Sequence, residues 1–180
     1  MSRDLLRRYR QQPLVVLEDI EHRPDFTALE YDRAGIERII PHRDPFLLLD
    51  GLTGLDLTSG EETLMGRRFI AEQDPVFLGH FPGEPVYPGA LQVEMGGQLG
   101  LCLNYFLRHR RAFIADDAEP VAVRVSRLLG AQFTAPLLPG SEVRITARKL
   151  EDDGFLGRVI SQVIAGGRIC SVSIAEVIFL

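Results

Sequence analysis

The sequence predicts an α+β protein in which an antiparallel sheet wraps around one long buried helix. Three observations carry this prediction. Residues 89–107 form an uninterrupted stretch with apolar side chains on all sides of a helix, which is typical of a buried helix. The chain after it alternates apolar and polar residues in several segments, as strands do. The pair Gly166–Gly167 separates the last two segments and indicates a two-residue hairpin.

Length and composition favour one folded domain. The chain has 180 residues, of which 46% are hydrophobic and 25% charged, a composition that builds a core and does not indicate disorder. Its formal charge of −5 argues against nucleic acid as the main partner, because phosphate binding needs a basic surplus. The longest uncharged stretches, such as residues 95–107, are shorter than the ~20 apolar residues of a membrane span. We expect a cytoplasmic protein, because the start has no apolar signal region.

The N-terminal third is the least regular part of the sequence. Residues 2–12 predict a short amphipathic helix with Leu5, Leu6 and Tyr9 on one side. Residues 13–35 are mixed and charged and show no clear period. The apolar run 46–50 follows Pro45 and predicts a buried strand, and residues 61–71 predict a second extended segment.

A loop rich in proline and glycine precedes the long helix. Four prolines fall within residues 73–89, and each removes a backbone donor and fixes φ. We therefore predict a rigid, irregular loop there. In the helix that follows, Gly96, Gly97 and Gly100 each cost helix stability, so we expect another backbone to pass close by.

The rest of the chain predicts strands. Val121, Val123 and Val125 alternate with less apolar residues, and residues 143–147 do the same. Residues 155–165 and 168–179 flank the predicted hairpin. With the two earlier segments this makes about six strands, four of them consecutive and antiparallel after the helix.

Two ionisable residues lie where chemistry is plausible. His80 is inside the rigid loop, and Glu94 is on the first turns of the helix. The free N–H groups near Gly89 form a site for an oxyanion or carbonyl. We expect burial to raise the pKa of Glu94 and keep it protonated. A base and an acid in one apolar pocket suit elimination of water from a carbonyl compound. The residues alone leave open that both are scaffold residues, with Glu94 satisfied by an arginine.

The isolated cysteines Cys102 and Cys170 have no metal-ligand spacing, and we interpret them as reduced packing residues.

Three motifs resemble one enzyme family. The longest is Gly79-His80-Phe81-Pro82-Gly83-x-Pro85-x-x-Pro88-Gly89-x-Leu91-x-x-Glu94. It resembles the signature of the beta-hydroxyacyl-[acyl-carrier-protein] dehydratases of FabZ type. Residues 39–50, with Pro41-His42-Arg43, and residues 131–140 are similar to two further segments of that family. The three motifs cover roughly residues 35–180, so the resemblance implies a domain at residues 35–180 that is preceded by an N-terminal extension, residues 1–34. The resemblance implies a hot-dog fold, a lyase acting on acyl thioesters of fatty-acid or related acyl-chain synthesis, and no metal or organic cofactor. It also implies a homodimer or a higher assembly such as a trimer of dimers.

The resemblance also implies roles for residues of this chain. His80 of one chain would face Glu94 of the other, take the proton from C2 of a 3-hydroxyacyl thioester, and leave Glu94 to protonate the departing hydroxyl. His42 is assigned a structural role at the pocket entrance. Residues expected to contact substrate or to orient the catalytic pair are Phe81, Val86, Tyr87, Gly89 and Gln98. Tyr87 would narrow the acyl tunnel.

An acidic acyl carrier protein is the implied partner, and it needs a basic docking face. Residues 101–150 hold eight basic and four acidic side chains. We therefore predict docking at Arg108, Arg110 and Arg111. Two other functions stay open: a hot-dog acyl thioesterase, and a non-catalytic hot-dog subunit that binds acyl carriers.

Overall fold

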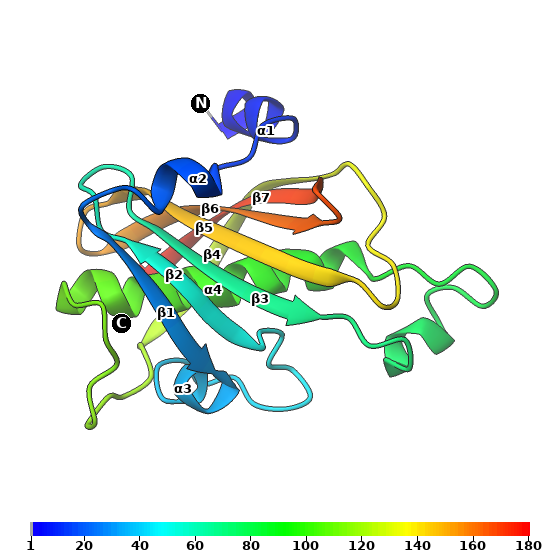
Figure 1. Cartoon of the computed structure of the whole chain (residues 1–180), viewed down its shortest axis with the longest axis horizontal. Helices are drawn as coiled ribbons and strands as arrows, with labels where there is room; N and C mark the ends of the chain where they lie inside the picture. The colour runs from blue at the N-terminus through cyan, green and yellow to red at the C-terminus, as the bar shows by residue number, and fades with distance from the viewer. Residues whose placement is uncertain (1) are drawn as a thin grey trace.

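The protein is described here by a computed structural model that covers residues 2–180, and it contains one seven-stranded antiparallel sheet (Figure 1). The strand order is β1-β2-β3-β5-β6-β7-β4. The strands are β1 (Phe26–Asp32), β2 (Gly51–Asp56), β3 (Thr63–Phe69), β4 (Val123–Phe133), β5 (Glu142–Asp152), β6 (Leu156–Ala165) and β7 (Arg168–Phe179). The helices are α1 (Ser2–Tyr9), α2 (Leu17–Ile20), α3 (Arg33–Glu37) and α4 (Gly89–His109), with a 3₁₀ helix η1 (Pro75–Leu78).

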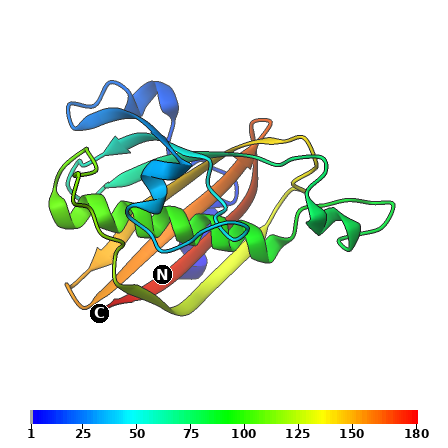
Figure 2. The ribbon, with the colours of Figure 1, turned by 90° about the horizontal axis from the view of Figure 1, so that it is seen from below.

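The long helix α4 lies along one face of the sheet, which curves around it (Figures 1 and 2). Leu99, Cys102 and Phe106 on this helix are fully buried in the main core. Gly96 lets the helix approach β6, because a Cβ there would lie 2.2 Å from the Ser161 hydroxyl oxygen. The close neighbour is thus a side chain and not the backbone that the sequence predicted. The predicted hot-dog arrangement is confirmed, with seven strands where about six were expected.

The opposite face of the sheet, called the outer face below, carries the N-terminal segment. Helix α1 packs there (Figure 1), and Leu6 joins a second core with Leu14, Ile160 and Ile174. Leu5 and Tyr9 are partly buried against the same cluster, so the predicted apolar side of this helix is the side that packs. Strand β1 then pairs with β2 at the sheet edge.

One predicted strand is wrong. Residues 47–49 are buried but form no strand, because several backbone groups of residues 46–49 bond to side chains instead of to a neighbouring strand. The Leu48 N–H donates to Gln98 Oε1 (2.8 Å), and the Leu47 carbonyl accepts from Arg33 and Arg68. The strand in this part of the chain is β2, which begins at Gly51, directly after the predicted segment. Strand β1, in residues that showed no period, was not predicted.

The other elements follow the sequence. Residues 73–89 form an irregular loop interrupted only by the short η1. Gly166 and Gly167 form the hairpin between β6 and β7 with φ of 54° and 74°, values that glycine adopts without strain. Cys102 and Cys170 are both buried free thiols. Within residues 2–180, no helix is long and apolar enough to cross a membrane.

Candidate active site

The loop between η1 and α4 holds His80 by backbone hydrogen bonds. The His80 N–H donates to the Val76 carbonyl (3.1 Å), and the Val86 N–H donates to the His80 carbonyl (3.0 Å). The loop is tied to the segment after β4 by the Tyr87 N–H, which donates to the Leu137 carbonyl (2.7 Å). Because the prolines leave few backbone donors, these bonds fix the loop without regular secondary structure.

The His80 ring is oriented by a backbone carbonyl. Its Nδ1 lies 2.8 Å from the Val86 oxygen. A carbonyl can only accept, so Nδ1 carries a proton, and in the neutral imidazole Nε2 therefore has the lone pair. The exposed Phe81 ring stacks on the imidazole, with ring centroids 4.1 Å apart. The structure thus brings His80, Val86 and Phe81 together, and leaves Nε2 as a base.

The start of α4 supplies backbone donors beside His80. Pro88 caps this helix without a side-chain hydrogen bond. Within the described chain, the N–H groups of Gly89 and Ala90 have no acceptor, whereas the Leu91 and Gln92 N–H groups bond to the Pro88 carbonyl. Two free N–H groups at the positive end of a helix dipole bind an oxyanion well. A Cβ at Gly89 would lie 2.7 Å from the Phe133 ring, so glycine is needed here.

His80 and these donors line one cavity of about 550 Å³. Its walls come from the loop, from the first turn of α4 and from the end of β4. The lining residues are His80, Val86, Tyr87, Gly89, Ala90, Gln92, Phe133, Thr134, Ala135 and Pro136. Tyr87 is 1% exposed and packs edge-on against Phe77, and burial raises the pKa of its hydroxyl. Its side chain belongs mainly to the core.

Glu94 lies on α4 in a separate network. Gln98 Nε2 donates to Glu94 Oε1 (2.9 Å) and to the Phe46 carbonyl (2.8 Å). His42 Nε2 lies 3.4 Å from the same carboxylate oxygen. Gln98 is therefore the buried link that fixes the carboxylate to residues 46–48, where it also accepts from the Leu48 N–H.

The expectation of a raised pKa for Glu94 is wrong. Hydrogen bonding from His42 and then from Gln98 lowers the pKa of the carboxyl group, and outweighs the opposing effect of burial. Donors stabilise the charged form of a carboxylate. The family resemblance implied only a structural role for His42, although its ring lies 3.4 Å from the Glu94 carboxylate. The Pro41-His42-Arg43 motif carried no signal of that contact, which joins distant parts of the chain.

Within this chain, His80 and Glu94 lie in separate networks, and the three arginines predicted to dock the carrier lie far from the cavity. No hydrogen bond or ion pair joins His80 to Glu94 within residues 2–180. Arg108, Arg110 and Arg111 lie at the end of α4 away from Gly89, about 30 Å along a helix of this length. Arg110 is 3.6 Å from Glu62, and Arg111 lies over the Phe113 ring.

The chain is similar to known proteins in sequence and in fold. The family profile described as "FabA-like domain" matches residues 40–171. A 3-hydroxyacyl-[acyl-carrier-protein] dehydratase FabZ from Granulibacter bethesdensis is 36% identical over 140 residues, which cover 74% of this chain and 77% of that one. A FabZ from Campylobacter jejuni is 32% identical over 138 residues, covering 77% and 90%.

Two solved structures share the fold at low sequence identity. The dehydratase heterocomplex ApeI:P from Xenorhabdus doucetiae gives a TM-score of 0.60 at 15% identity and covers 81% of this chain and 91% of that one. An uncharacterized protein from Pyrococcus horikoshii gives a TM-score of 0.55 at 14% identity, covering 86% and 95%.

Proposed function

The chain belongs to the FabA-like family, and we propose that it removes water from 3-hydroxyacyl thioesters carried by acyl carrier protein, giving trans-2-enoyl thioesters. Relatives at 36% and 32% identity are named for this activity. The observation that carries the proposal in this chain is the His80 ring, with Nδ1 on the Val86 carbonyl, in one cavity with the start of α4.

His80 is the proposed base. Its Nε2 takes the proton from C2, and the electron pair of that C–H bond forms the C2–C3 double bond while the C3–O bond breaks. The thioester carbonyl develops negative charge in this step. The Gly89 and Ala90 N–H groups, beside His80 in the same cavity, would stabilise that charge.

Glu94 is the proposed source of the proton that turns the leaving hydroxyl into water. Hydrogen bonds from His42 and Gln98 lower the pKa of its carboxyl in this chain and so favour the ionised form. The acid role therefore requires substrate and a second chain to cover it and exclude water, since desolvation raises the pKa of a carboxyl group. Gln98 and His42 would then aim the acid at C3.

A homodimer through β4 would complete the site. This strand ends the sheet, and one of its edges has no neighbouring strand within the described residues. Val125, Leu128 and Phe133 on it are 53–59% exposed. An exposed apolar edge strand pairs readily with another chain. Pairing of two β4 strands is proposed to bring His80 of one subunit to Glu94 of the partner subunit.

The test is hydration of a crotonyl thioester and the reverse dehydration of the 3-hydroxybutyryl thioester, with product identification. We expect interconversion of the two thioesters, and a loss of about 10²–10⁴-fold in His80→Ala. The control is His22→Ala, an exposed histidine away from the cavity, which should keep full activity. Full activity in His80→Ala, or release of free acid and thiol as the main products, would overturn the proposal.

A further inference from the structure

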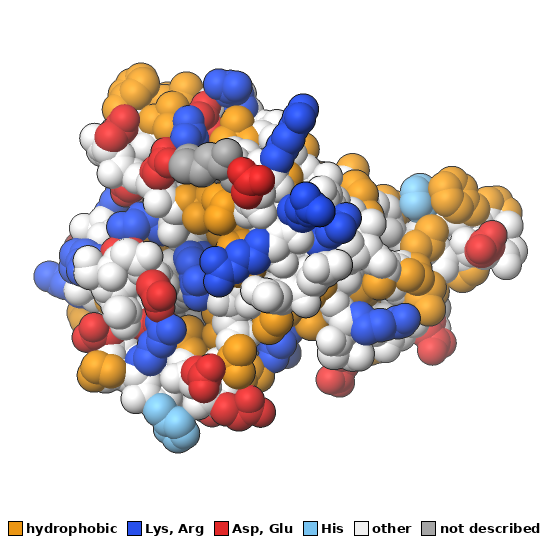
Figure 3. Space-filling model, turned by 90° about the horizontal axis from the view of Figure 1, so that it is seen from above, with side chains coloured by type: hydrophobic (Ala, Val, Ile, Leu, Met, Phe, Trp, Pro, Cys, Tyr) orange, Lys and Arg blue, Asp and Glu red, His pale blue; other side chains and the backbone are white. Residues whose placement is uncertain are grey.

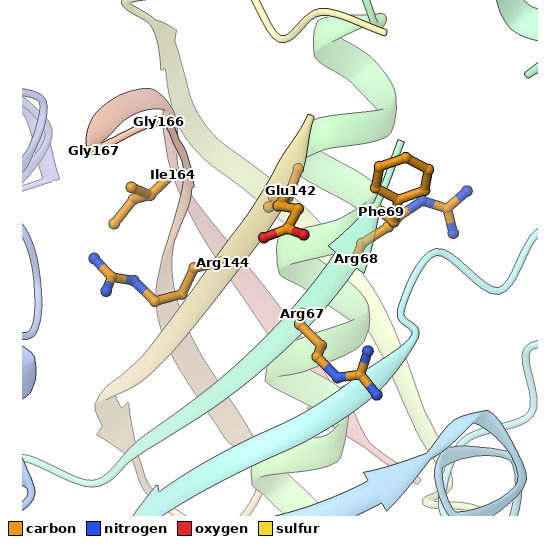
Figure 4. A pocket seen from close by; sticks show the side chains of 9 residues that line it. Arg67, Arg68, Phe69, Glu142, Arg144, Ile164, Gly166 and Gly167 are labelled. Carbon is orange, nitrogen blue, oxygen red and sulfur yellow. The ribbon is translucent and has the colours of Figure 1, made fainter. Parts of the chain in front are cut away.

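The outer face of the sheet carries a groove made of two adjoining hollows. The first has a volume of about 420 Å³ and lies over the ends of β3, β5 and β6 (Figure 4). The second, of about 410 Å³, shares Arg144, Ile164 and Gly167 with the first. We call the two together the outer-face groove. Its polar and charged lining residues are Arg10, Gln11, Arg67, Arg68, Thr134, Glu142, Arg144 and Arg168.

The groove adjoins the candidate active site. Thr134 and Ala135 line both the second hollow and the cavity that holds His80. A molecule seated in the groove therefore lies next to the mouth of the cavity. A flexible arm attached to that molecule could enter the cavity across Thr134 and Ala135.

Four of the five arginines that line the groove have no partner among the described residues, whereas Arg68 donates to the Leu47 carbonyl. Among the described residues, no ion pair or side-chain hydrogen bond is formed by Arg10, Arg67, Arg144 or Arg168, and Glu142 is the one carboxylate in the lining. The Nε of Arg144 is buried without an acceptor. Arg144 as a whole is partly exposed and lines both hollows, so its terminal nitrogens, and not the buried Nε, are accessible to a group outside the chain.

The pairing of strands places two of these arginines on neighbouring positions of the sheet. Arg67 on β3 and Arg144 on β5 are register partners, and Figure 4 shows their side chains extending in opposite directions, with Glu142 between the two strands' residues. The two guanidinium groups therefore present positive charge on both sides of the hollow. Figure 3 looks onto this face and shows basic side chains gathered on it with apolar ones between them.

The N-terminal segment builds one wall of the groove. Arg10, Gln11 and Pro13 come from the residues that follow α1, outside the family match at residues 40–171. The fully buried Gln162 holds this segment: its Nε2 donates to the Gln12 carbonyl (2.8 Å), and its Oε1 accepts from the Leu14 N–H (2.7 Å). These two bonds attach the segment that carries Arg10 to strand β6.

We propose that the outer-face groove docks the acyl carrier protein and that the N-terminal segment is part of this recognition surface. The inference rests on the proposed function. Acyl carrier proteins are acidic, and unpaired arginines attract an acidic partner locally although the whole chain carries a charge of −5. The groove replaces Arg108, Arg110 and Arg111 as the docking face, since it adjoins the cavity and they lie at the far end of α4.

The decisive experiment compares substrates of two sizes. Arg10→Glu, Arg168→Glu and the double variant are assayed with crotonyl-acyl carrier protein and with the crotonyl thioester of N-acetylcysteamine. We expect KM for the carrier-bound substrate to rise about tenfold in the double variant, with the rise shrinking at high salt. KM and kcat for the small thioester should stay within about twofold of the unmodified protein, because it makes no contact in the groove.

Arg7→Glu is the matched control, because Arg7 is an exposed residue of α1 that does not line the groove. The triple charge reversal of Arg108, Arg110 and Arg111 tests the other surface. An unchanged KM in the double variant would overturn the proposal, as would an equal rise in Arg7→Glu or a larger one in the triple variant. Loss with both substrates would also overturn it, because that pattern indicates damage to the site.

Direct binding separates this proposal from the proposed function. Fluorescence anisotropy measures the affinity of unacylated carrier protein for the unmodified chain and the variants. Weaker binding in the double variant supports the groove even if no thioester is dehydrated. Equal binding by all variants would overturn the groove and leave the dehydratase proposal standing.

Discussion

The His42 imidazole lies 3.4 Å, Nε2 to Oε1, from the Glu94 carboxylate. His42 comes from the segment before β2, and Glu94 from α4. The carboxylate of Glu94, the proposed acid, is therefore contacted by the imidazole of His42, which lies outside the motif at residues 79–94. The ring also stacks near Phe46, with centroids 6.3 Å apart, and Phe46 is tied through its carbonyl to Gln98. These contacts lead to the first two predictions.

Replacing His42 by glutamine should raise the pKa of Glu94. The hydrogen bond from His42 is the main cause of the lowered Glu94 pKa. Burial acts in the opposite direction and raises the pKa, so its effect becomes larger relative to the hydrogen bonds when His42 is replaced by a weaker donor. NMR titration of ¹³C-labelled glutamate measures this directly. Because the folded pKa lies below the usual 4.5, the ionised carboxylate stabilises the fold above about pH 4.5, and this is lost as pH falls through the folded pKa. The variant should show a smaller loss of stability between neutral and acidic pH. An unchanged Glu94 pKa would contradict the assignment.

Replacing Gln98 by leucine should lower both stability and activity. The buried Leu48 N–H and the partly buried Phe46 carbonyl would lose their partner. Leaving a buried group unpaired costs about 1–3 kcal/mol, which urea denaturation resolves. Gln92→Leu is the control, because buried Gln92 makes only one long hydrogen bond, 3.4 Å to the Tyr87 carbonyl. A loss in Gln98→Leu no larger than in the control would show that this network adds no stability.

Alanine at two adjacent glycines of α4 should have opposite effects. At Gly96 a Cβ would lie 2.2 Å from the Ser161 oxygen, whereas at Gly97 no atom lies within 4 Å. Gly96→Ala should cost about 1–3 kcal/mol through overpacking, and Gly97→Ala should gain up to about 1 kcal/mol from helix propensity. Thermal unfolding of the two variants checks the order. Equal stability would mean that α4 does not sit on β6 as described.

Mixing two inactive variants tests the shared site. His80→Ala and Glu94→Gln are each expected to be inactive. After co-refolding, half of a dimer population is mixed, and each mixed dimer has one intact His80–Glu94 pair, which restores about a quarter of full activity. A mixture that stays inactive would show that both residues must come from one chain.

A variant that should prevent dimer formation serves as the control for the mixing experiment. Leu128→Asp on the exposed edge strand β4 should give a monomer by light scattering, and should abolish the recovery in the mixture. A dimer that persists with Leu128→Asp would place the interface elsewhere.

The sequence predicted the elements whose backbone bonds stay within helices or between successive strands. Helix α4, the β6–β7 hairpin and β3 follow from local periodicity and turn residues. Residues 46–50 misled the prediction because their hydrogen bonds go to Gln98, Arg33 and Arg68, none of which a local pattern reveals. Strand β1 was missed because its burial does not alternate. The motif identified Glu94, but the lowering of the Glu94 pKa depends mainly on a hydrogen bond from His42, which the motif does not reveal. The placement of Arg67 and Arg144 on paired positions of β3 and β5 depends on strand register, which the sequence does not specify.

The hydrogen bond between Leu14 and Gln162 gives the chain an order of assembly. The segment that carries Arg10 is synthesised well before its anchor on β6, since Leu14 and Gln162 lie 148 residues apart in the sequence. Contacts between such distant residues are slow to form, because a long loop must close first. The core around α4 can form without them. The groove is therefore expected to be the last surface to mature, and a growing chain has no formed groove with which to capture a carrier.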